Sequence, residues 1–451
     1  MTSFIAKPHE LFDRFDPKYV AFKRRAASFR YPAVTMGSLL SEPPEYGAGE
    51  AGIERVDEAT PRYIRITDID ENGELLSGLG MTAANVEPQY FLRDGDLLFA
   101  RSGNTVGKSY LHESERVPYP CFYAGYMIRF RFGEKVLPKY VFAFAQTPYY
   151  HEWVSAIQRS AGQPNINAQE YRSLEIPLPP LQEQRKIVAE LDAAYAAKRA
   201  ADEKATKLLA SIDDMVLNEL GIAKLPKPDT SLSSRIFTVP ASKVANATFA
   251  PDHYFDMIDF SGAKYPCERF VERIDIDPPF GNVKITKLVP MEGVSAEWCA
   301  IEDVEDIAAD ATQGYSTFHG GDVIWARITP CMENGKSAVV EAQPSECFCG
   351  STEFLVFRPK DDTVNPYYLQ SILHLNRFRE VAAHHFTGTS GHQRVTADFF
   401  KSITIPIPPR TVQDRIASKA SSIRAEARKL KADATAALDA AKREIEARIV
   451  A

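Results

Sequence analysis

With 451 residues, of which 45% are hydrophobic and 25% charged, the chain has the composition of a globular protein with two or more domains. No apolar run approaches the length of a membrane span, and the first ten residues lack an apolar signal segment, so we expect a cytoplasmic protein. Six cysteines without mirrored spacing fit a reducing compartment. The net charge of −7 excludes a generally basic surface, so any phosphate contacts require a local cluster of cations.

Residues 1–180 have the pattern of a mixed α/β domain. Alternating apolar residues predict a strand at 63–69, and a short apolar run after a turn predicts another at 95–100. A third strand is expected at 125–132. Pro138 stands where a helix begins, because proline is well tolerated in the first helical turn.

A proline-rich strap and a long helical segment follow this domain. Residues 176–180 read Ile-Pro-Leu-Pro-Pro, which predicts an extended segment, since proline fits neither a helix interior nor a central strand. Residues 181–220 contain no glycine or proline, and their apolar residues recur in steps of three and four. This narrow stripe favours a helix about 60 Å long that pairs with another helix. Gly221 is expected to end it.

The same order returns at a constant offset of 229 residues. This offset takes residue 176 to residue 405, where Ile-Pro-Ile-Pro-Pro precedes a second helical run to the end of the chain. A gapless repeat of this kind indicates two copies of one unit. The sequence therefore predicts two α/β (α+β) heads joined by two long antiparallel helices that form a coiled-coil spacer, with an internal two-fold repeat. The predicted domains are head 1 (1–180), spacer helix 1 (181–221), head 2 (222–409) and spacer helix 2 (410–451).

The second head repeats the first more loosely. We expect residues 298–304 to correspond to residues 63–69, and residues 321–327 to correspond to residues 95–101. A helix is expected to begin after Asn365, as one does at Pro138.

Two motifs are reminiscent of enzymes and are incomplete. Residues 103–109, Gly-Asn-Thr-Val-Gly-Lys-Ser, lack the first glycine of a phosphate-binding loop, because Ser102 stands in its place. We interpret the Gly-Lys-Ser of each head as a turn, with Lys108 and Lys336 available for a phosphate. Residues 277–280, Asp-Pro-Pro-Phe, match the tetrapeptide with which adenine-N6 methyltransferases hold a base, but no glycine-rich cofactor loop accompanies it. A self-contained methyltransferase is therefore the less favoured alternative.

No catalytic or metal-binding residues are predicted. Cys347 and Cys349 lack the second ligand pair that a tetrahedral zinc site needs.

Candidate DNA-binding residues lie at matching places in the two heads. Arg101 and Arg327 directly follow the short predicted strands, and polar loops precede the two straps. Arginine, glutamine, asparagine and histidine are the types that contact base edges and phosphates. An equally good interpretation is that these loops make turns and cap the next helix. A basic run near the N-terminus is either a further phosphate contact or a solvated helix face. The other candidates are Gln163, Asn165, Asn167, His392, Gln393, Arg394, Lys23, Arg24 and Arg25.

Around the straps the sequence resembles the specificity subunit of type I restriction–modification systems. The resemblance lies in Gly162-Gln-Pro-Asn-Ile-Asn167, in residues 176–187 and in their counterparts at 391–416, although Arg410-Thr-Val-Gln413 departs from the pattern. The architecture agrees over essentially the whole chain.

The resemblance implies a non-catalytic subunit whose two target-recognition domains each bind half of a split double-stranded DNA site. It further implies that the two helices act as a ruler and dock methyltransferase subunits, which bring S-adenosylmethionine and methylate adenine, while restriction subunits join them. A recognition subunit of a type II enzyme remains an alternative that the sequence does not distinguish. The spacer and docking candidates are Gln184, Leu191, Tyr195, Leu209, Ile212, Gln413, Ile416, Ile423 and Leu430.

Overall fold

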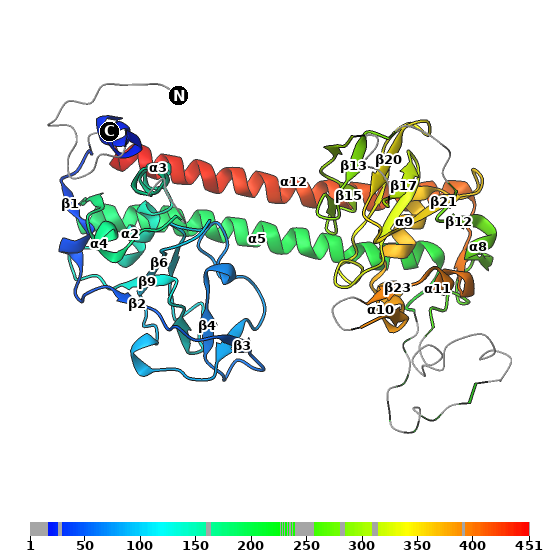
Figure 1. The fold of residues 1–451 in the computed structure, drawn as a ribbon, viewed down its shortest axis with the longest axis horizontal. Helices are drawn as coiled ribbons and strands as arrows, with labels where there is room; N and C mark the ends of the chain where they lie inside the picture. Colours follow the sequence, from blue (N-terminus) through cyan, green and yellow to red (C-terminus); the bar gives the residue numbers. More distant parts are fainter. Residues whose placement is uncertain are drawn as a thin grey trace. The chain divides into compact units, whose positions relative to one another are not determined.

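The computed structural model describes residues 17–25, 29–158, 164–225, 257–279, 285–308, 314–389 and 393–450, and single positions between 227 and 239. The chain folds as two compact units (Figure 1). One unit contains residues 1–200 and 433–451, and the other contains residues 201–432. Each of the two long helices therefore contributes to both units. Among the described residues, no helix combines the length and the apolar character needed to cross a membrane.

The head of the first unit is built on two small four-stranded sheets. One has the strand order β2-β9-β6-β7 and is antiparallel throughout. The other has the order β3-β5-β4-β8, in which β4 and β8 run parallel. The strands are β1 (Ala33–Thr35), β2 (Glu45–Tyr46), β3 (Gly52–Glu54), β4 (Arg62–Ile64), β5 (Met81–Ala83), β6 (Leu97–Ala100), β7 (Ser109–Leu111), β8 (Cys121–Tyr123), β9 (Met127–Phe130) and β10 (Glu175–Pro177).

Two of the predicted strands of this head, β6 and β9, are confirmed, and both are buried along their whole length. The strand predicted at 63–69 is shorter, because β4 ends at Ile64 and a 3-10 turn follows at Ile66–Asp68. The Asp68 carboxylate closes this turn by accepting hydrogen bonds from the Arg65 backbone amide and guanidinium, both at 2.9 Å.

Among the described residues, four short α-helices cover the first head. They are α1 (Pro17–Arg25), α2 (Pro138–Phe144), α3 (Pro148–Ile157) and α4 (Ala168–Arg172). Helix α2 begins at Pro138, as predicted. Between the helices and the β2-β9-β6-β7 sheet lies a core rich in aromatic rings, in which Phe99 stacks on Tyr171 with ring centres 4.9 Å apart. Stacked pairs of this kind add to the stabilisation that comes from apolar burial.

The head of the second unit contains two sheets of the same kind. Their strand orders are β12-β21-β18-β19 and β16-β13-β20-β17. The strands are β11 (Cys267–Arg269), β12 (Ile274–Ile276), β13 (Lys287–Val289), β14 (Val294–Ser295), β15 (Ala300–Ile301), β16 (Glu305–Asp306), β17 (Ser316–His319), β18 (Val323–Ala326), β19 (Ser337–Val339), β20 (Cys347–Gly350), β21 (Phe354–Pro359), β22 (Phe386–Thr387), β23 (Arg394–Val395) and β24 (Thr404–Pro406). The helices are α8 (Phe270–Arg273), α9 (Pro366–His374), α10 (Asn376–His384) and α11 (Ala397–Ser402).

Strand pairing shows which parts of the two heads correspond. Strand β13 runs parallel to β20, as β4 runs parallel to β8. Strand β13, at Lys287–Val289, therefore occupies the place of β4, and the prediction that residues 298–304 would do so is wrong. That segment instead meets the second long helix, where the Trp298 ring centre lies 5.7 Å from the Arg428 guanidinium carbon. Helix α9 begins directly after its cap Asn365, as predicted.

The two straps are extended, as predicted, and each adds one strand to a two-stranded ribbon. Strand β10 pairs antiparallel with β1, and β24 pairs antiparallel with β11. Beyond these pairs, the Leu178 amide donates to the Pro32 carbonyl at 2.9 Å, and the Ile407 amide donates to the Pro266 carbonyl at 2.8 Å. Prolines then remove the next donors, so the ribbons stop where the long helices begin.

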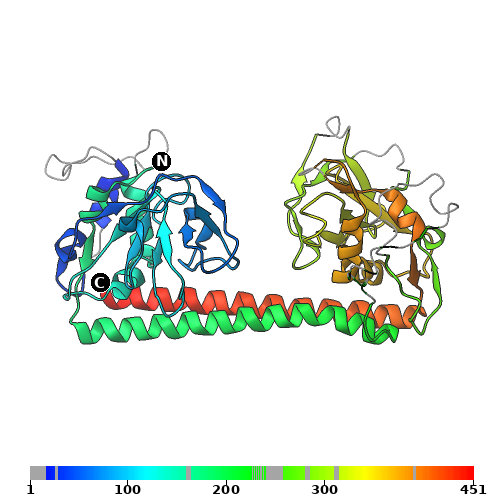
Figure 2. The ribbon, with the colours of Figure 1, turned by 90° about the horizontal axis from the view of Figure 1, so that it is seen from below.

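The long helices are α5 (Leu181–Leu220) and α12 (Arg410–Ile449), each of 40 residues. Gly221 ends α5 with a φ of +77°, as predicted. Within each unit the two helices lie side by side (Figure 2). In the first unit Glu190 of α5 pairs with Arg448, whereas Tyr195 lies against Lys442, so the helices run antiparallel there.

The apolar stripe of each helix is buried within both units. In the first unit, Ile187 and Leu191 of α5 and Ile445 and Ile449 of α12 belong to the same core as the head. In the second unit, the corresponding core contains Val216 and Leu220 of α5 and Ile416 and Ala420 of α12. The helices therefore serve each head as part of its hydrophobic core.

Candidate nucleic-acid interface

The first head brings Arg101 and the loop before the strap into one place. The Arg101 amide donates to the Tyr126 carbonyl at 2.9 Å, which continues the pairing of β6 with β9. On the other side, the Ile166 amide donates to the Arg101 carbonyl at 2.8 Å, and the Gly103 amide donates to the Pro164 carbonyl at 3.0 Å. Two segments more than sixty residues apart thus form a single small surface.

Two tyrosines accompany Arg101 on this surface. The Arg101 guanidinium carbon lies 4.8 Å from the centre of the Tyr46 ring, a cation–π distance. Tyr46 is 39% exposed and Tyr126 is 67% exposed. The Arg101 Nε is buried and has no hydrogen-bond partner among the described residues. An arginine beside exposed aromatic rings is a combination that can contact bases and the DNA backbone.

Of the two asparagines predicted in this loop, one is a helix cap. The Asn167 side chain accepts from the Glu170 amide at 2.9 Å, and the Glu170 carboxylate accepts from the Asn167 amide at 2.9 Å. This capping box supports the structural interpretation of Asn167. Asn165 is half-buried, and its backbone forms an isolated antiparallel β-bridge with Ser102, next to Arg101. Gln163 lies outside the described residues.

The second head repeats the same backbone frame with different side chains. The Arg327 amide donates to the Glu353 carbonyl, and the Val395 amide donates to the Arg327 carbonyl, both at 2.9 Å. The Thr329 amide donates to the carbonyl of Gln393 at 3.0 Å, so the loop before the second strap also lies beside the strand end. His392 lies outside the described residues.

The charges at this second surface are partly compensated. Glu353 occupies the place of Tyr126, and its carboxylate accepts hydrogen bonds from Arg394 Nη2 at 2.6 Å and Nε at 2.8 Å. These hydrogen bonds raise the pKa of Arg394 above its ordinary value. Arg327 Nε lies 3.8 Å from the same carboxylate. The geometry therefore does not favour Arg394 as an independent base-reading side chain, and Arg327 is the better candidate of the two.

The lysines of the two Gly-Lys-Ser turns are held inside their heads. Lys108 Nζ donates to the Ile69 carbonyl at 2.9 Å and pairs with Glu71 at 2.9 Å. Lys336 Nζ donates to the Met291 carbonyl at 2.7 Å. Both amines bind the segment that follows the parallel strand of their sheet, so the geometry does not favour them as phosphate ligands.

The loop at 103–109 is a turn, as predicted. The Val106 amide donates to the Gly103 carbonyl at 3.2 Å, and the Lys108 amide donates to the Thr105 carbonyl at 3.1 Å. The Gly107 amide donates to the Ala100 carbonyl at 3.1 Å. Since these donors are used within the turn, they cannot cradle a phosphate in the manner of a nucleotide-binding loop.

Side chains from two further sequence motifs, Lys23 and Asp277, are bound by other parts of the same chain. Lys23 Nζ pairs with Glu175 at 2.9 Å, so one charge of the N-terminal basic run is used between α1 and the strap; the side chains of Arg24 and Arg25 lie outside the described residues. The Asp277 carboxylate accepts from the Val356 amide at 2.9 Å and extends the pairing of β12 with β21. Asp277 is therefore occupied in the sheet edge, and Phe280 of its tetrapeptide is not described.

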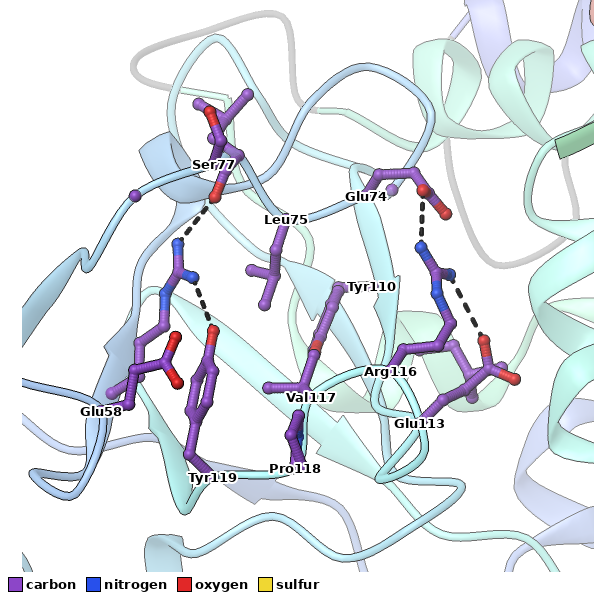
Figure 3. A pocket seen from close by; sticks show the side chains of 15 residues that line it. Glu58, Glu74, Leu75, Ser77, Tyr110, Glu113, Arg116, Val117, Pro118 and Tyr119 are labelled. Atoms are coloured by element: carbon purple, nitrogen blue, oxygen red, sulfur yellow. Dashed lines mark hydrogen bonds and ion pairs between the residues drawn. The ribbon is translucent and has the colours of Figure 1, made fainter. Parts of the chain in front are cut away.

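A cavity of about 390 Å³ opens in the first head beside its parallel strands (Figure 3). Arg116 lies between Glu74 and Glu113, and its nearest contact is 2.6 Å to Glu74. Burial opposes ionisation of Glu74, but Arg116 and Arg199 overcome this effect and hold its pKa below the ordinary value. Arg62 also lines the cavity and donates to the Tyr119 hydroxyl and the Leu76 carbonyl, both at 3.0 Å. Arg199 of α5 lies 3.2 Å from Glu74 and anchors the helix to this head.

No cluster of three or more histidine, cysteine, aspartate or glutamate side chains suitable for a metal ion occurs in the part of the chain that the structure describes.

Gln184 and Gln413, predicted above as spacer or docking residues, are completely buried. The Leu137 amide donates to Gln184 Oε1 at 2.9 Å, and Gln184 Nε2 donates to the Pro179 carbonyl at 2.9 Å. Gln413 makes the same contacts with the Asn365 amide at 2.8 Å and the Pro408 carbonyl at 2.8 Å. Their assignment to partner docking is wrong, because a side chain without exposed surface cannot contact another protein. Each glutamine ties a strap and a head to the start of its helix.

The remaining candidates on the helices are seam residues. Leu191, Tyr195, Ile212 and Ile416 are buried within the two hydrophobic cores, and the Tyr195 hydroxyl donates to the Asn72 carbonyl at 2.6 Å. The half-buried members of the set are Leu209, Ile423 and Leu430. All of these residues except Leu430 belong to the two cores or pack against them, and their role in spacing the heads stays a prediction.

The structure adds three residues that the sequence did not single out, Tyr46, Tyr126 and Glu353. Tyr126 and Glu353 hold the same place beside the arginine of each head, directly before the strand that pairs with it. Tyr126 lies within the strand predicted at 125–132, which is the available signal for it, whereas no predicted strand adjoins Glu353. Tyr46 carried none, because its contact with Arg101 joins segments 55 residues apart.

The family described as the type I restriction modification DNA specificity domain matches this chain twice, over residues 63–207 and residues 284–437. The two matches together cover more than half of the chain. Each contains most of the described strands of one head, a strap and the first part of a long helix, although β2 and β3 of the first head and β12 of the second lie outside the matches. The chain belongs to the type I restriction–modification DNA specificity family.

Individual members of the family match this chain over only part of its length. Over 131 residues, 29% of this chain, it is 34% identical to the type I restriction enzyme EcoAI specificity subunit of Escherichia coli, of which the match covers 22%. It is 25% identical over 223 residues, 48% of this chain, to the EcoKI specificity subunit of Escherichia coli K12, of which 45% is covered. The chain thus matches less than half the length of either relative. A chain in a solved type I restriction–modification system matches with 19% identity and a TM-score of 0.47, over 93% of this chain and 98% of the other.

Proposed function

We propose that this chain is the DNA sequence-recognition subunit of a type I restriction–modification complex. The observation that carries the proposal is the double match to the specificity family, once for each head and helix. Each head binds one half of a bipartite double-stranded DNA site. Arg101 with Tyr46 and Tyr126 in one head, and Arg327 in the other, are the side chains that we place against DNA.

The difference between the two surfaces supports two different half-sites. One surface combines an arginine with two exposed tyrosines, and the other combines two arginines with a carboxylate. Because hydrogen-bond donors and acceptors at base edges differ between base pairs, side chains of different chemistry on one backbone frame select different bases.

In this proposal the long helices act as the spacer between half-sites and, as a paired antiparallel coiled coil, dock two adenine-N6 methyltransferase subunits. The chain itself is non-catalytic, and S-adenosylmethionine is bound by the methyltransferase subunits. Restriction subunits join the same assembly. Support for these roles comes from membership of the family together with two 40-residue helices that pack on each other within each unit.

The test is reconstitution from the separately purified chain and its methyltransferase subunits. Transfer of a labelled methyl group from S-adenosylmethionine to adenine in DNA is expected only when both are present, and the chain alone is expected not to bind S-adenosylmethionine in calorimetry. Methyl transfer by the chain alone would contradict the proposal. So would failure of the tagged chain to capture a methyltransferase from the cells that express it.

A further inference from the structure

Ion pairs between α5 and α12 occur at repeat-related positions in the two units. In the first unit Arg448 of α12 binds Glu190 of α5, with contacts of 2.7 and 3.0 Å. In the second unit Glu219 of α5 binds Lys419 at 2.7 Å and Arg415 at 2.8 Å, both on α12. Hydrogen bonds from Lys419 and Arg415 lower the pKa of Glu219 to about 2.

The offset of 229 residues relates these pairs to each other with reversed charges. It takes Glu190 to Lys419 and Glu219 to Arg448. The first repeat therefore carries a carboxylate at both positions, and the second repeat carries a cation at both. As a result α5 contributes the acidic partner, and α12 the basic partner, in each unit.

Part of the apolar seam does not make this distinction. The same offset takes Ile187 to Ile416, Val216 to Ile445 and Leu220 to Ile449, and all six side chains are buried in the two cores. At these positions the seam would also allow α5 to pair with α5, or α12 with α12. Elsewhere the offset takes Leu191 to Ala420 and Tyr195 to Arg424, so packing differs there, and the polar positions add their own selection between unlike and like helices.

Two copies of α12 paired in this register would bring cations together. Arg448 of one helix would meet Lys419 and Arg415 of the other. In the first unit Tyr195 of α5 lies against Lys442 of α12, and the offset takes Tyr195 to Arg424. In a pair of α12 helices, Arg424 of one helix would therefore meet Lys442 of the other. Like charges in such positions are destabilising.

Two copies of α5 would bring carboxylates together. Glu219 of one helix would meet Glu190 and Glu183, the two residues that Arg448 contacts in the chain. Lys186 also lies nearby, but it is already paired with Glu183 at 3.1 Å. The clash is therefore weaker for α5 with α5 than for α12 with α12.

We infer that these ion pairs select the unlike helix as the partner of each long helix. The first half of a chain, head 1 with α5, therefore assembles with the second half, head 2 with α12, of the same or another copy. Two first halves do not assemble with each other. The partner that fits each helix is thus the opposite repeat of this chain. The inference concerns assembly of the chain and does not depend on its role in DNA recognition.

The full chain can test this inference after one cut. A protease site inserted between residues 240 and 250 allows the folded protein to be cleaved between the heads, and the two halves differ enough in mass to be distinguished by native mass spectrometry. Mixing isotopically labelled and unlabelled cleaved protein reports whether halves have exchanged. Wild-type protein is expected to form exchanged dimers of unlike halves, with like-half dimers at background.

The deciding variant is the double substitution Glu190→Lys with Arg448→Glu. It preserves an opposite-charge pair in the unlike dimer, but it also creates opposite-charge pairs in both like dimers, with Glu219 and with Lys419. Like-half dimers should increase on the order of tenfold or more, because several contacts between the helices change from like to opposite charge. Thermal melting of the uncut double variant controls for loss of folding. The variant keeps the pair between positions 190 and 448 with its charges exchanged, and it loses only the longer contact of position 448 with Glu183, 3.9 Å in the wild type.

A matched control is Glu203→Lys, which makes the same charge change at an exposed position of α5 away from these pairs. Like-half dimers in the exchanged wild type at an abundance comparable with unlike dimers would overturn the inference. An unchanged distribution in the double variant, or the same increase in the Glu203→Lys control, would overturn it as well.

Discussion

Buried glutamines show how single side chains join the helices to the heads. Gln413 makes hydrogen bonds with the Asn365 amide and with the carbonyls of Thr363 and Pro408, all at 2.8 Å, without exposure to water. A residue of this type usually lies at the surface, so complete burial implies that the polar contacts are essential to the packing.

We expect Gln413→Leu to reduce the free energy of unfolding by about 2–4 kcal/mol, because it leaves a buried amide and two carbonyls without partners. Chemical denaturation of the full chain measures this change. The neighbouring exposed Thr411→Ala serves as control and should stay within about 0.5 kcal/mol of the wild type. If Gln413→Leu reduced the free energy of unfolding by less than the control does, the glutamine would not tie the second head to its helix.

Arg101 and Arg327 test the proposed DNA surfaces. Replacing Arg101 by alanine in the methyltransferase complex should weaken binding by about 1–3 kcal/mol, and Arg327→Ala should have a similar effect on the other half-site. Binding to DNA with either half-site altered shows which head each arginine serves. Equal loss for all DNA sequences would show that these arginines contact only phosphates. Arg172→Ala, a charge change at the exposed end of α4, is the control.

Glu74 gives a pH-dependent prediction. Its folded-state pKa is lowered below the unfolded value by Arg116 and Arg199 against the effect of burial, so its stabilisation is present above the unfolded pKa and is lost as pH falls. Glu74→Gln should cost about 1–2 kcal/mol at pH 7, and the difference from wild type should shrink below about pH 4. Denaturant titrations at several pH values measure it. A difference that does not change with pH would contradict the assigned role of the charge.

Residue roles were predictable only where the contact is local. Asn167 lies three residues before Glu170, so a capping box was readable from the sequence. The pairing of Arg394 with Glu353, and of Lys108 with the Ile69 carbonyl, joins segments about forty residues apart. No local pattern encodes such contacts, so these side chains looked available for DNA.

At the scale of elements, the straps and helices follow from local chemistry. Proline fixes the straps, an uninterrupted run of helix formers gives α5 and α12, and Gly221 ends the first of them. The correspondence between heads was harder to predict, because loops of different length separate their strands. An apolar pattern aligns residues 298–304 with residues 63–69, whereas the structure uses that stretch to contact α12 through Trp298.

The spacer role of the helices can be tested by lengthening both. Glu219 lies opposite Lys419, so Leu209 lies near the level of Lys429 in the second unit. One heptad inserted after each of these residues keeps the seam in register and adds about 10 Å. The preferred gap between half-sites should grow by about three base pairs. Methylation of a set of DNAs with graded gaps measures it, and an unchanged preference would contradict the ruler.

At the scale of the whole chain, a net charge of −7 has to be reconciled with DNA binding. Basic residues outnumber acidic ones in the second long helix region, with 10 against 6, but not in the heads. Much of this charge is used in contacts with α5 and with the head, including the pairs of Arg415 and Arg448 and the contact of Arg428 with Glu302. The proposed complex therefore needs basic surface from its methyltransferase subunits to hold the DNA.

The most direct test of the central claim is a genome-wide map of N6-methyladenine in cells with and without this gene. The account predicts that deletion removes methylation at one class of split, asymmetric motif and leaves other motifs unchanged, and that returning the gene restores it. The lost motif would then name the bases that the two heads bind. The control is to check that the gene and its methyltransferase are expressed in the same cells. Persistence of every methylated motif after deletion would contradict the assignment of this chain as a DNA sequence-recognition subunit.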